Sequence, residues 1–125
     1  GFLNVGATDR EYTVSEYAKL LSEKLGAAVR FSYCTDKIKK VAVCSGAGAD
    51  FFACAKKLGC DALVTGDASY HDFLDAAHSG IAVFAAGHFE TEVIIVQKLQ
   101  KILSEKFEDT QFVVSDRPNP ILTEK

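Results

Sequence analysis

Hydrophobic positions along the chain follow two patterns, one typical of helices and one typical of buried strands. Helical spacing appears first in residues 14–25, where apolar side chains recur every three or four positions. Thr13 and Glu16 form a capping-box pattern at its start, and a glycine follows its end. A strand is predicted over residues 28–33, followed by a polar, turn-like segment at 35–40.

Three units of a short apolar strand, a turn of small residues and a helix then follow one another. The predicted strands are 41–44, 62–65 and 81–85, and the predicted helices are 49–58, 70–77 and 89–107. A last strand is predicted at 111–115, before two prolines that can join neither a helix nor a sheet. Such successive βαβ units predict an α/β fold with a mostly parallel or mixed sheet and helices on both faces.

The chain has the size of one compact domain, with 125 residues of which 48% are hydrophobic. We predict an α/β domain over residues 13–117, preceded by a linker at 1–12 and followed by a tail at 118–125. The chain contains no methionine and opens on Gly-Phe-Leu-Asn-Val-Gly. These two features predict a fragment, with the linker leading from a missing N-terminal domain.

Composition narrows the classes of partner. The formal net charge is -3, with 14 basic and 17 acidic residues spread along the chain, so nucleic acid is not expected as the primary partner. The apolar runs are too short for a membrane span, and no leader precedes them. No C-x-x-C pair occurs, and buried free thiols in a reducing cytoplasm are favoured over disulfides or zinc ligation. The four cysteines are Cys34, Cys44, Cys54 and Cys60.

Polar residues and glycines gather in the turns after the three predicted parallel strands. Parallel strands place these turns at one edge of the sheet, where open α/β folds bind ligands. This convergence predicts a site at the carboxyl edge. Its candidate residues are Ser45, Gly46 and Gly48 after the first strand, Gly66, Asp67 and His71 after the second, and Gly87, His88 and Glu92 after the third.

His88 and Glu92 are the candidate metal ligands. They are four residues apart at the start of a predicted helix, so an imidazole and a carboxylate share one helix face. Such a pair can supply two ligands to a divalent ion. The spacing alone also allows a Glu that complements the helix dipole and a His that fills a turn. Glu90 is predicted to be a solvated charge.

The other candidates at this edge allow two interpretations each. Asp67 and His71 could act as acid, base or support for a metal ligand, or could be a turn-forming Asp that caps the helix beginning near Tyr70 and an exposed His. The 45–48 loop could offer backbone N–H groups to a phosphate, as in a nucleotide-binding domain, or could be a tight turn permitted by glycine. His78, late in its helix, is assigned no function.

Three motifs make a resemblance visible. They are V-A-V-C-S-G-A-G from Val41, L-V-T-G-D-A-S-Y-H-D from Leu63 and G-H-F-E-T-E from Gly87. In this order and spacing the chain resembles the C-terminal half of the Nif-three-like family, whose members are also called GTP cyclohydrolase I type 2 homologs. The resemblance implies two related α/β halves that close on a dinuclear metal site, and assembly into a hexameric ring.

The resemblance assigns roles to individual residues. His88 and Glu92 fall on the family's two C-terminal ligands, while Asp67 and His71 match a motif that borders the same cleft. The family's other ligands, a histidine pair and a further acidic residue, belong to the missing half. We therefore expect half of a site here, with weak metal binding and no turnover by the isolated chain.

The resemblance also implies a function for the intact protein. Two divalent ions per subunit, of zinc, manganese, iron or magnesium, would support hydrolysis of a nucleotide, phosphoester or cyclic amide, and the substrate is not specified. The alternative is a non-catalytic metal-binding protein that regulates or interacts with a partner, because a fold and a metal site do not fix a function.

Overall fold

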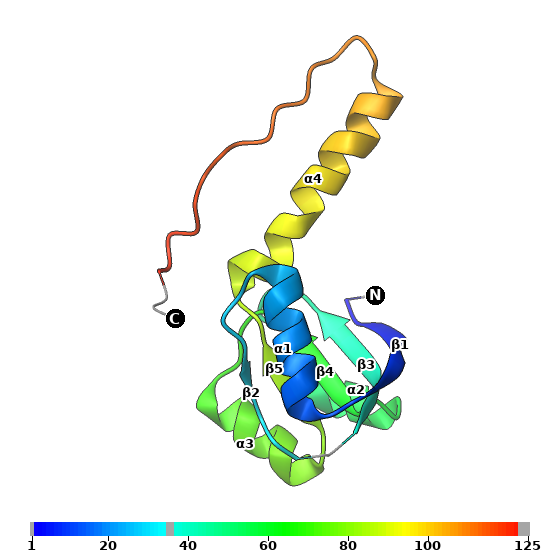
Figure 1. Cartoon of the computed structure of the whole chain (residues 1–125), viewed down its shortest axis with the longest axis vertical. Helices are drawn as coiled ribbons and strands as arrows, with labels where there is room; N and C mark the ends of the chain where they lie inside the picture. Colours follow the sequence, from blue (N-terminus) through cyan, green and yellow to red (C-terminus); the bar gives the residue numbers. More distant parts are fainter. Residues whose placement is uncertain (1, 35–36, 123–125) are drawn as a thin grey trace.

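A five-stranded mixed sheet forms the centre of the structure, with the strand order β1-β3-β4-β5-β2 (Figure 1). The computed structural model describes residues 2–34 and 37–122. The strands are β1 (Asn4–Tyr12), β2 (Arg30–Phe31), β3 (Ile38–Cys44), β4 (Ala62–Thr65) and β5 (Ala82–Ala85). The three central strands β3, β4 and β5 are parallel, whereas the two edge strands are antiparallel to their neighbours. The predicted α/β class with a mixed sheet is confirmed.

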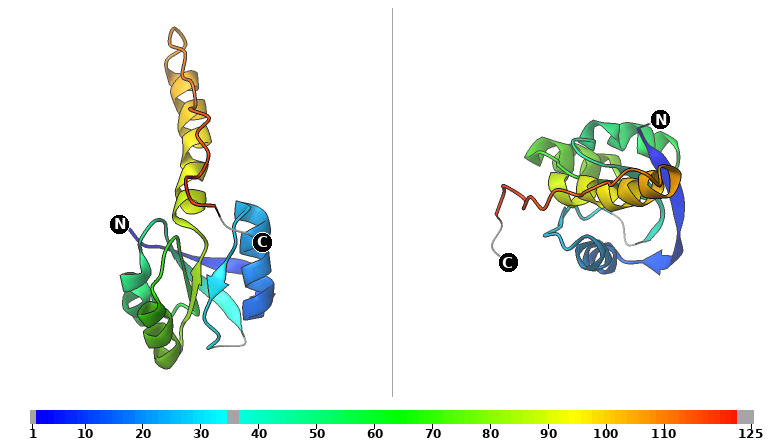
Figure 2. Two further views of the ribbon diagram at one scale, coloured as in Figure 1. Left: turned by 90° about the vertical axis from the view of Figure 1, so that its left-hand side faces the viewer. Right: turned by 90° about the horizontal axis from the view of Figure 1, so that it is seen from above.

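Helices cover both faces of this sheet. They are α1 (Val14–Leu25), α2 (Phe52–Lys57) with a preceding 3-10 turn η1 (Ala49–Phe51), α3 (Tyr70–Ser79) and α4 (His88–Lys106). Figure 2 shows α1 on one face of the sheet and α2 with α3 on the other. The long helix α4 instead projects away from the sheet, and the tail that follows it runs back beside it.

Successive side chains of a strand point to opposite faces of the sheet, and they divide the core into two hydrophobic clusters. On β4, Leu63 faces the cluster under α2 and α3, and Val64 faces the cluster under α1. Phe84 of β5 lies in the α1 cluster, where its ring centroid is 5.3 Å from that of Tyr17 and 5.9 Å from that of Phe31. The central strands are therefore buried on both faces, as their wholly apolar sequences predict.

Helix α1 has the boundaries that its end signals predict. The Thr13 side chain accepts a hydrogen bond from the Glu16 amide, and the Glu16 carboxylate accepts one from the Thr13 amide, at 3.2 and 2.8 Å. Gly26 ends the helix with a φ of 65°, in the left-handed region that glycine adopts without strain.

Three local predictions are wrong. Residues 4–12, expected to be a linker, form β1 and pair with β3, which also extends into the segment expected to be a turn at 35–40. Residues 35 and 36 of that turn lie outside the described residues. The segment 111–115 forms no strand. Among the described residues it pairs with no strand, and a hydrogen bond of 2.8 Å from Gln100 Nε2 to the carbonyl of Phe112 holds it against α4 instead.

The cysteines match the predicted free thiols only in part. All four are free, and Cys44 and Cys60 are buried, but Cys34 is half-buried and Cys54 is exposed. Burial raises the pKa of the Cys60 thiol above its usual range. None of the helices in the described ranges combines the length and apolarity that crossing a membrane requires.

The packing of Phe84 yields a prediction about stability. Phe84 is 0% exposed and Phe2 is 84% exposed, so the two residues test burial with the same side chain. Phe84→Ala should reduce the free energy of unfolding in urea by about 3–5 kcal/mol, because it removes a buried ring and leaves a cavity. Phe2→Ala should change it by less than about 0.5 kcal/mol. Equal effects of the two substitutions would contradict the assignment of Phe84 to the core.

Candidate metal centre

The turns after β3, β4 and β5 meet at the carboxyl edge of the sheet, as predicted. A single carbonyl connects the first two turns. The oxygen of Gly46 accepts hydrogen bonds from the Thr65 hydroxyl at 3.0 Å and from the amides of Gly66 and Asp67 at 2.8 and 3.0 Å. Thr65 is fully buried, and its oxygen also accepts a hydrogen bond from the amide of Gly48 at 2.9 Å. These bonds fix the β3 turn against the end of β4.

Thr91 ties the third turn to the first. Its hydroxyl accepts a hydrogen bond from the Gly46 amide at 3.3 Å and donates one to the Gly87 carbonyl at 2.8 Å. The Gly87 amide donates to the Gly66 carbonyl at 2.9 Å, which links the second and third turns. The sequence alone indicates no role for Thr91, although this residue lies within the G-H-F-E-T-E motif.

His88 stands between two carboxylates. Its Nδ1 is 2.6 Å from Oδ2 of Asp67, and its Nε2 is 3.2 Å from Oε1 of Glu92. Asp67 lies in the turn that follows β4, whereas Glu92 lies one helical turn after His88 on α4. The structure thus confirms that His88 and Glu92 share a helix face. It also pairs Asp67 with His88, where the sequence had suggested only Asp67 with His71.

This arrangement controls the protonation of the imidazole. The hydrogen bond to Asp67 is the main cause that raises the pKa of His88, and the negative charge of Glu92 adds to it. Because a carboxylate can only accept, Nδ1 is the nitrogen that keeps its proton when the imidazolium becomes neutral, and Nε2, on the Glu92 side, is then the nitrogen able to bind a metal ion. A carboxylate on the second ring nitrogen is the usual partner of a metal-binding histidine.

Gly46 lies directly beneath the His88 and Glu92 side chains. A Cβ atom added to it would be 2.6 Å from Oε1 of Glu92 and 3.3 Å from Nε2 of His88, and its φ is +67°. Gly66 is equally confined, since an added Cβ would be 2.7 Å from the Gly46 carbonyl oxygen and 2.9 Å from the Cα of His88. Glycine is required at Gly66 because its nearest neighbours are backbone atoms, whereas Gly46 is favoured by its positive φ and an added Cβ would displace the Glu92 carboxylate.

The His88 and Glu92 side chains suit a divalent ion as two of its ligands. Imidazole nitrogen and carboxylate oxygen bind zinc, manganese and iron, and two ligands of one ion lie about 3 Å apart when each bond is about 2.1 Å. The Nε2 to Oε1 distance of 3.2 Å agrees with this, and the two side chains are 46% and 53% exposed, so an ion can reach them. Within residues 2–34 and 37–122, no group of three or more potential ligands surrounds a common point. His88 and Glu92 therefore remain a pair of candidate ligands.

The 45–48 loop does not form a phosphate cradle. The amides of Gly46 and Gly48 donate to the hydroxyls of Thr91 and Thr65, so they point into the protein and not outwards. An added Cβ on Gly48 would meet the Cys44 side chain, in agreement with a glycine-permitted tight turn. The following helix begins as a 3-10 turn of three residues, and α2 has only six.

His71 is not brought into contact with Asp67 or His88. It is exposed in the first turn of α3, where its ring centroid is 5.8 Å from that of Tyr70. Asp67 does not cap this helix either, since Ser69 is the N-cap residue and forms a capping box with Asp72. The interpretation of His71 as an exposed side chain is the one the contacts support.

Two hollows flank His88 and Glu92. The first, which we call the Arg30 pocket, has a volume of about 190 Å³. Its polar lining comes from Arg30, Gly66, Asp67, His88, Glu90 and Asn119. The second, the Glu92 hollow, has a volume of about 520 Å³ and is lined by Ser45, Thr91 and Glu92 together with apolar residues such as Ile94 and Ile95. The two candidate ligands thus separate a polar pocket from a larger and more apolar hollow.

Glu90 makes a contact that the sequence did not predict. Its Oε1 accepts a hydrogen bond of 2.9 Å from Nδ2 of Asn119, so it holds the tail against the Arg30 pocket and is not simply a solvated charge. Neither Asn119 nor Arg30 was a candidate in the sequence. Both are distant from His88 along the chain, and only the fold brings them to this edge.

Residues 1–120 match the family model described as Duf34/NIF3 (NGG1p interacting factor 3). The chain belongs to the NIF3 family. A GTP cyclohydrolase 1 type 2 homolog of Clostridium perfringens is 37% identical over 110 residues, covering 85% of this chain and 42% of that protein. Another, of Clostridium acetobutylicum, is 43% identical over 90 residues, covering 66% of this chain and 34% of that protein. The family resemblance seen in the three sequence motifs is confirmed.

Solved structures show the same NIF3 fold. Staphylococcus aureus protein SA1388 superposes with a TM-score of 0.91 at 26% identity, covering 100% of this chain and 42% of that one. A Bacillus cereus protein related to NIF3 superposes with a TM-score of 0.90 at 30% identity, covering 99% and 36%. The chain therefore spans about two fifths of the length of the relatives it matches.

The contact between Asp67 and His88 predicts a titration. In the metal-free chain, Asp67→Asn should lower the pKa of His88, measured by NMR, because it removes the charge that favours the imidazolium. Asp50→Asn, which changes a carboxylate without contact to His88, should leave that pKa in place. Folding raises the pKa of His88, so the contact between His88 and Asp67 stabilises the fold fully below the pKa that the histidine has in the unfolded chain. This stabilisation is lost as pH rises through the raised pKa of the folded chain. An unchanged pKa in Asp67→Asn would show that the contact does not persist in solution.

The confinement of Gly46 predicts a difference between two glycine substitutions. Gly46 and Gly26 have φ values of +67° and +65°, but nothing lies within 4 Å of an added Cβ on Gly26. Gly26→Ala should therefore lower the free energy of unfolding in urea by only about 1–2 kcal/mol, the cost of a Cβ atom in the left-handed backbone conformation. Gly46→Ala should lower the free energy of unfolding by more than this and should also shift the NMR signals of His88. Equal costs with unshifted His88 signals would contradict the close approach.

Proposed function

We propose that His88 and Glu92 supply two ligands of a dinuclear metal site in the intact protein, which acts as a metal-dependent hydrolase. The observation that carries the proposal is the three-residue arrangement of Asp67, His88 and Glu92. A histidine whose Nδ1 is held by a carboxylate, and whose Nε2 faces a second carboxylate one helical turn away, is built as metal-binding histidines are. The further ligands would come from the part of the relatives that lies outside this chain.

The exposed face of α4 supports a second body over the site. None of the residues of α4 is buried, and Ile95 and Leu99 are 52% and 47% exposed. They follow His88 and Glu92 at spacings of three and four, so ligands and apolar residues share one face of the helix. We call this face the α4 stripe. A partner that buried the α4 stripe would lie directly over His88 and Glu92 and could complete the ligand set.

The residues of this chain have separate tasks in that site. His88 and Glu92 hold an ion, Asp67 fixes the orientation and the tautomer of His88, and Gly46 leaves room beneath them. Ions of zinc, manganese, iron or magnesium bound there would act as Lewis acids towards water and towards a carbonyl or phosphoryl group. The family relation suggests a nucleotide, phosphoester or cyclic amide as substrate.

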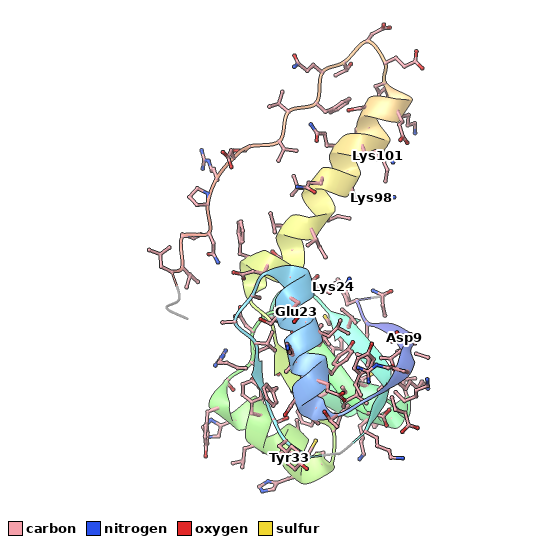
Figure 3. The ribbon with its side chains drawn as sticks, viewed as in Figure 1. Asp9, Glu23, Lys24, Tyr33, Lys98 and Lys101 are labelled. Carbon is pink, nitrogen blue, oxygen red and sulfur yellow. The ribbon has the colours of Figure 1, made fainter. Side chains whose placement is uncertain are left out.

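The intact protein is proposed to be a cytoplasmic homo-oligomer, in keeping with the hexameric ring that the family resemblance implies. The apolar half of the α4 stripe supports a further interface, because exposed apolar side chains such as Ile95 and Leu99 next to each other often mark an interaction site. Figure 3 marks Lys98 and Lys101 on the projecting part of α4. Lys101 lies on the helix side opposite the α4 stripe, whereas Lys98, three residues after Ile95, lies at the border of the stripe.

The same α4 stripe favours a second candidate function, a non-catalytic metal-binding protein that interacts with a partner. In that case the metal ions would order the interface and no substrate would be turned over. The two candidates share the ligands and differ in turnover. An intact protein that binds two ions but hydrolyses no nucleotide, phosphoester or cyclic amide would favour the interaction protein.

Metal content of the full-length protein tests the proposal. Elemental analysis after dialysis should find about two ions per subunit. The His88→Ala, Glu92→Ala double variant should lose them, because two ligands are removed together. The 125-residue chain alone should retain far less metal, since it supplies only two ligands.

The matched control is a His71→Ala, His78→Ala double variant, which removes two exposed histidines of α3 and should keep the metal content unchanged. A full-length protein without metal, or a His88→Ala, Glu92→Ala variant that keeps both ions, would refute the metal site. His88 and Glu92 would then be structural residues.

A further inference from the structure

Arg30 reaches the carboxyl edge from a strand that carries no other candidate residue. It lies on β2, opposite Ala85 at the end of β5. Its side chain lines the Arg30 pocket and also a neighbouring hollow of about 370 Å³. Asp67 is the other residue that these two linings share. Arg30 therefore lies close to the residue that orients His88.

Contacts with the protein hold the guanidinium of Arg30 in place. Its Nη2 donates a hydrogen bond of 3.2 Å to the Ala68 carbonyl, and its Cζ is 5.6 Å from the ring centroid of Phe73. Throughout the described ranges, no carboxylate oxygen lies within the 4.0 Å of the guanidinium that an ion pair requires. Arginine has five N–H donors, and the protein uses one of them here. The charge is thus positioned but unpaired.

The carboxylates around the Arg30 pocket already have donors of their own. Asp67 is bonded to His88, and Glu90 to Asn119. In the neighbouring hollow, Asp72 accepts a hydrogen bond from the Ser69 amide at 2.6 Å. Asp50 completes the acidic lining there without an ion pair to Arg30. Arg30 is exposed, so its remaining guanidinium donors face solvent beside the pocket and are available to an anionic ligand.

The tail forms the outer wall of this pocket. Asn119 donates to Glu90, and its side-chain oxygen accepts a hydrogen bond from the Ile121 amide at 2.9 Å. Ile121 and Asn119 thereby join Arg30 and His88 in one lining, although they come from distant parts of the chain. The pocket volume of about 190 Å³ accommodates a small polar group next to the candidate metal ligands.

We propose that Arg30 binds an oxyanion of the substrate, a carboxylate or a phosphate, in the pocket beside His88. The planar guanidinium can hold such a group through two parallel N–H donors, which an ammonium cannot do. The anion would anchor the substrate while the remainder extends past His88 towards Glu92. That this anion belongs to a substrate rests on the proposed hydrolase function, but the anion site itself does not.

The test is an NMR titration of the metal-free chain with inorganic phosphate and, separately, with acetate. Saturable shifts are expected for the Arg30 side-chain N–H and for the amides of Gly66 and Gly87. Arg30→Gln should weaken the binding about tenfold or more, because it removes the charge-assisted hydrogen bonds. Arg10→Gln, which changes an exposed arginine on β1 paired with Glu16, is the matched control and should bind as the original chain does.

A second variant protects the test against misfolding. Arg30→Lys keeps the charge and the contact with Phe73 but loses the two parallel donors, so it should fold and bind more weakly than the original chain. Tighter binding of phosphate or of acetate identifies which oxyanion the pocket prefers. No saturable binding of either probe, or equal affinity in the original chain, Arg30→Gln and Arg30→Lys, would overturn the proposal. Because no metal is present, this result is independent of the metal content that tests the hydrolase.

Discussion

The carbonyl of Gly46 accepts three hydrogen bonds from the end of β4, and the geometry of the carboxyl edge depends on this junction. The parallel register of β3 and β4 brings the two turns together, and the hydroxyls of Thr65 and Thr91 satisfy the amides that the β3 turn would otherwise bury. Each bond contributes about 1 kcal/mol net, but losing one would leave a buried polar group unpaired at a larger cost. The junction is therefore rigid, and it holds Asp67 where His88 meets it.

Helix α4 carries the two candidate ligands, His88 and Glu92, from this junction into an exposed setting. Its first turn contains His88 and is tied to the sheet through Thr91, while the rest of the helix buries none of its residues. A helix gains most of its stability in proteins from packing, so the exposed apolar side chains of Ile95 and Leu99 support the proposal of a covering surface. The packed body would thus preorganise one side of the metal site, and the covering surface would contribute the other.

The sequence predicted elements that local patterns define and missed those that distant contacts define. The strand at 62–65 was found because its apolar run is bounded by turn residues. Residues 4–12 were not, since an exposed edge strand is polar and depends on its partner β3, and 111–115 has a strand pattern without a partner. The spacing of His88 and Glu92 is local and was predicted, whereas the contact of Asp67 with His88 depends on the adjacency of β4 and β5.

Central to this account is a metal-binding Nε2 on His88, prepared by the bond between Nδ1 and Asp67. Nitrogen-15 NMR of the imidazole, recorded while zinc is added in excess to this chain, observes both ring nitrogens directly. The account predicts that the Nε2 signal moves to the range of a metal-bound nitrogen while Nδ1 remains protonated. Coordination through Nδ1, or an imidazole spectrum that excess zinc leaves unchanged, would contradict it.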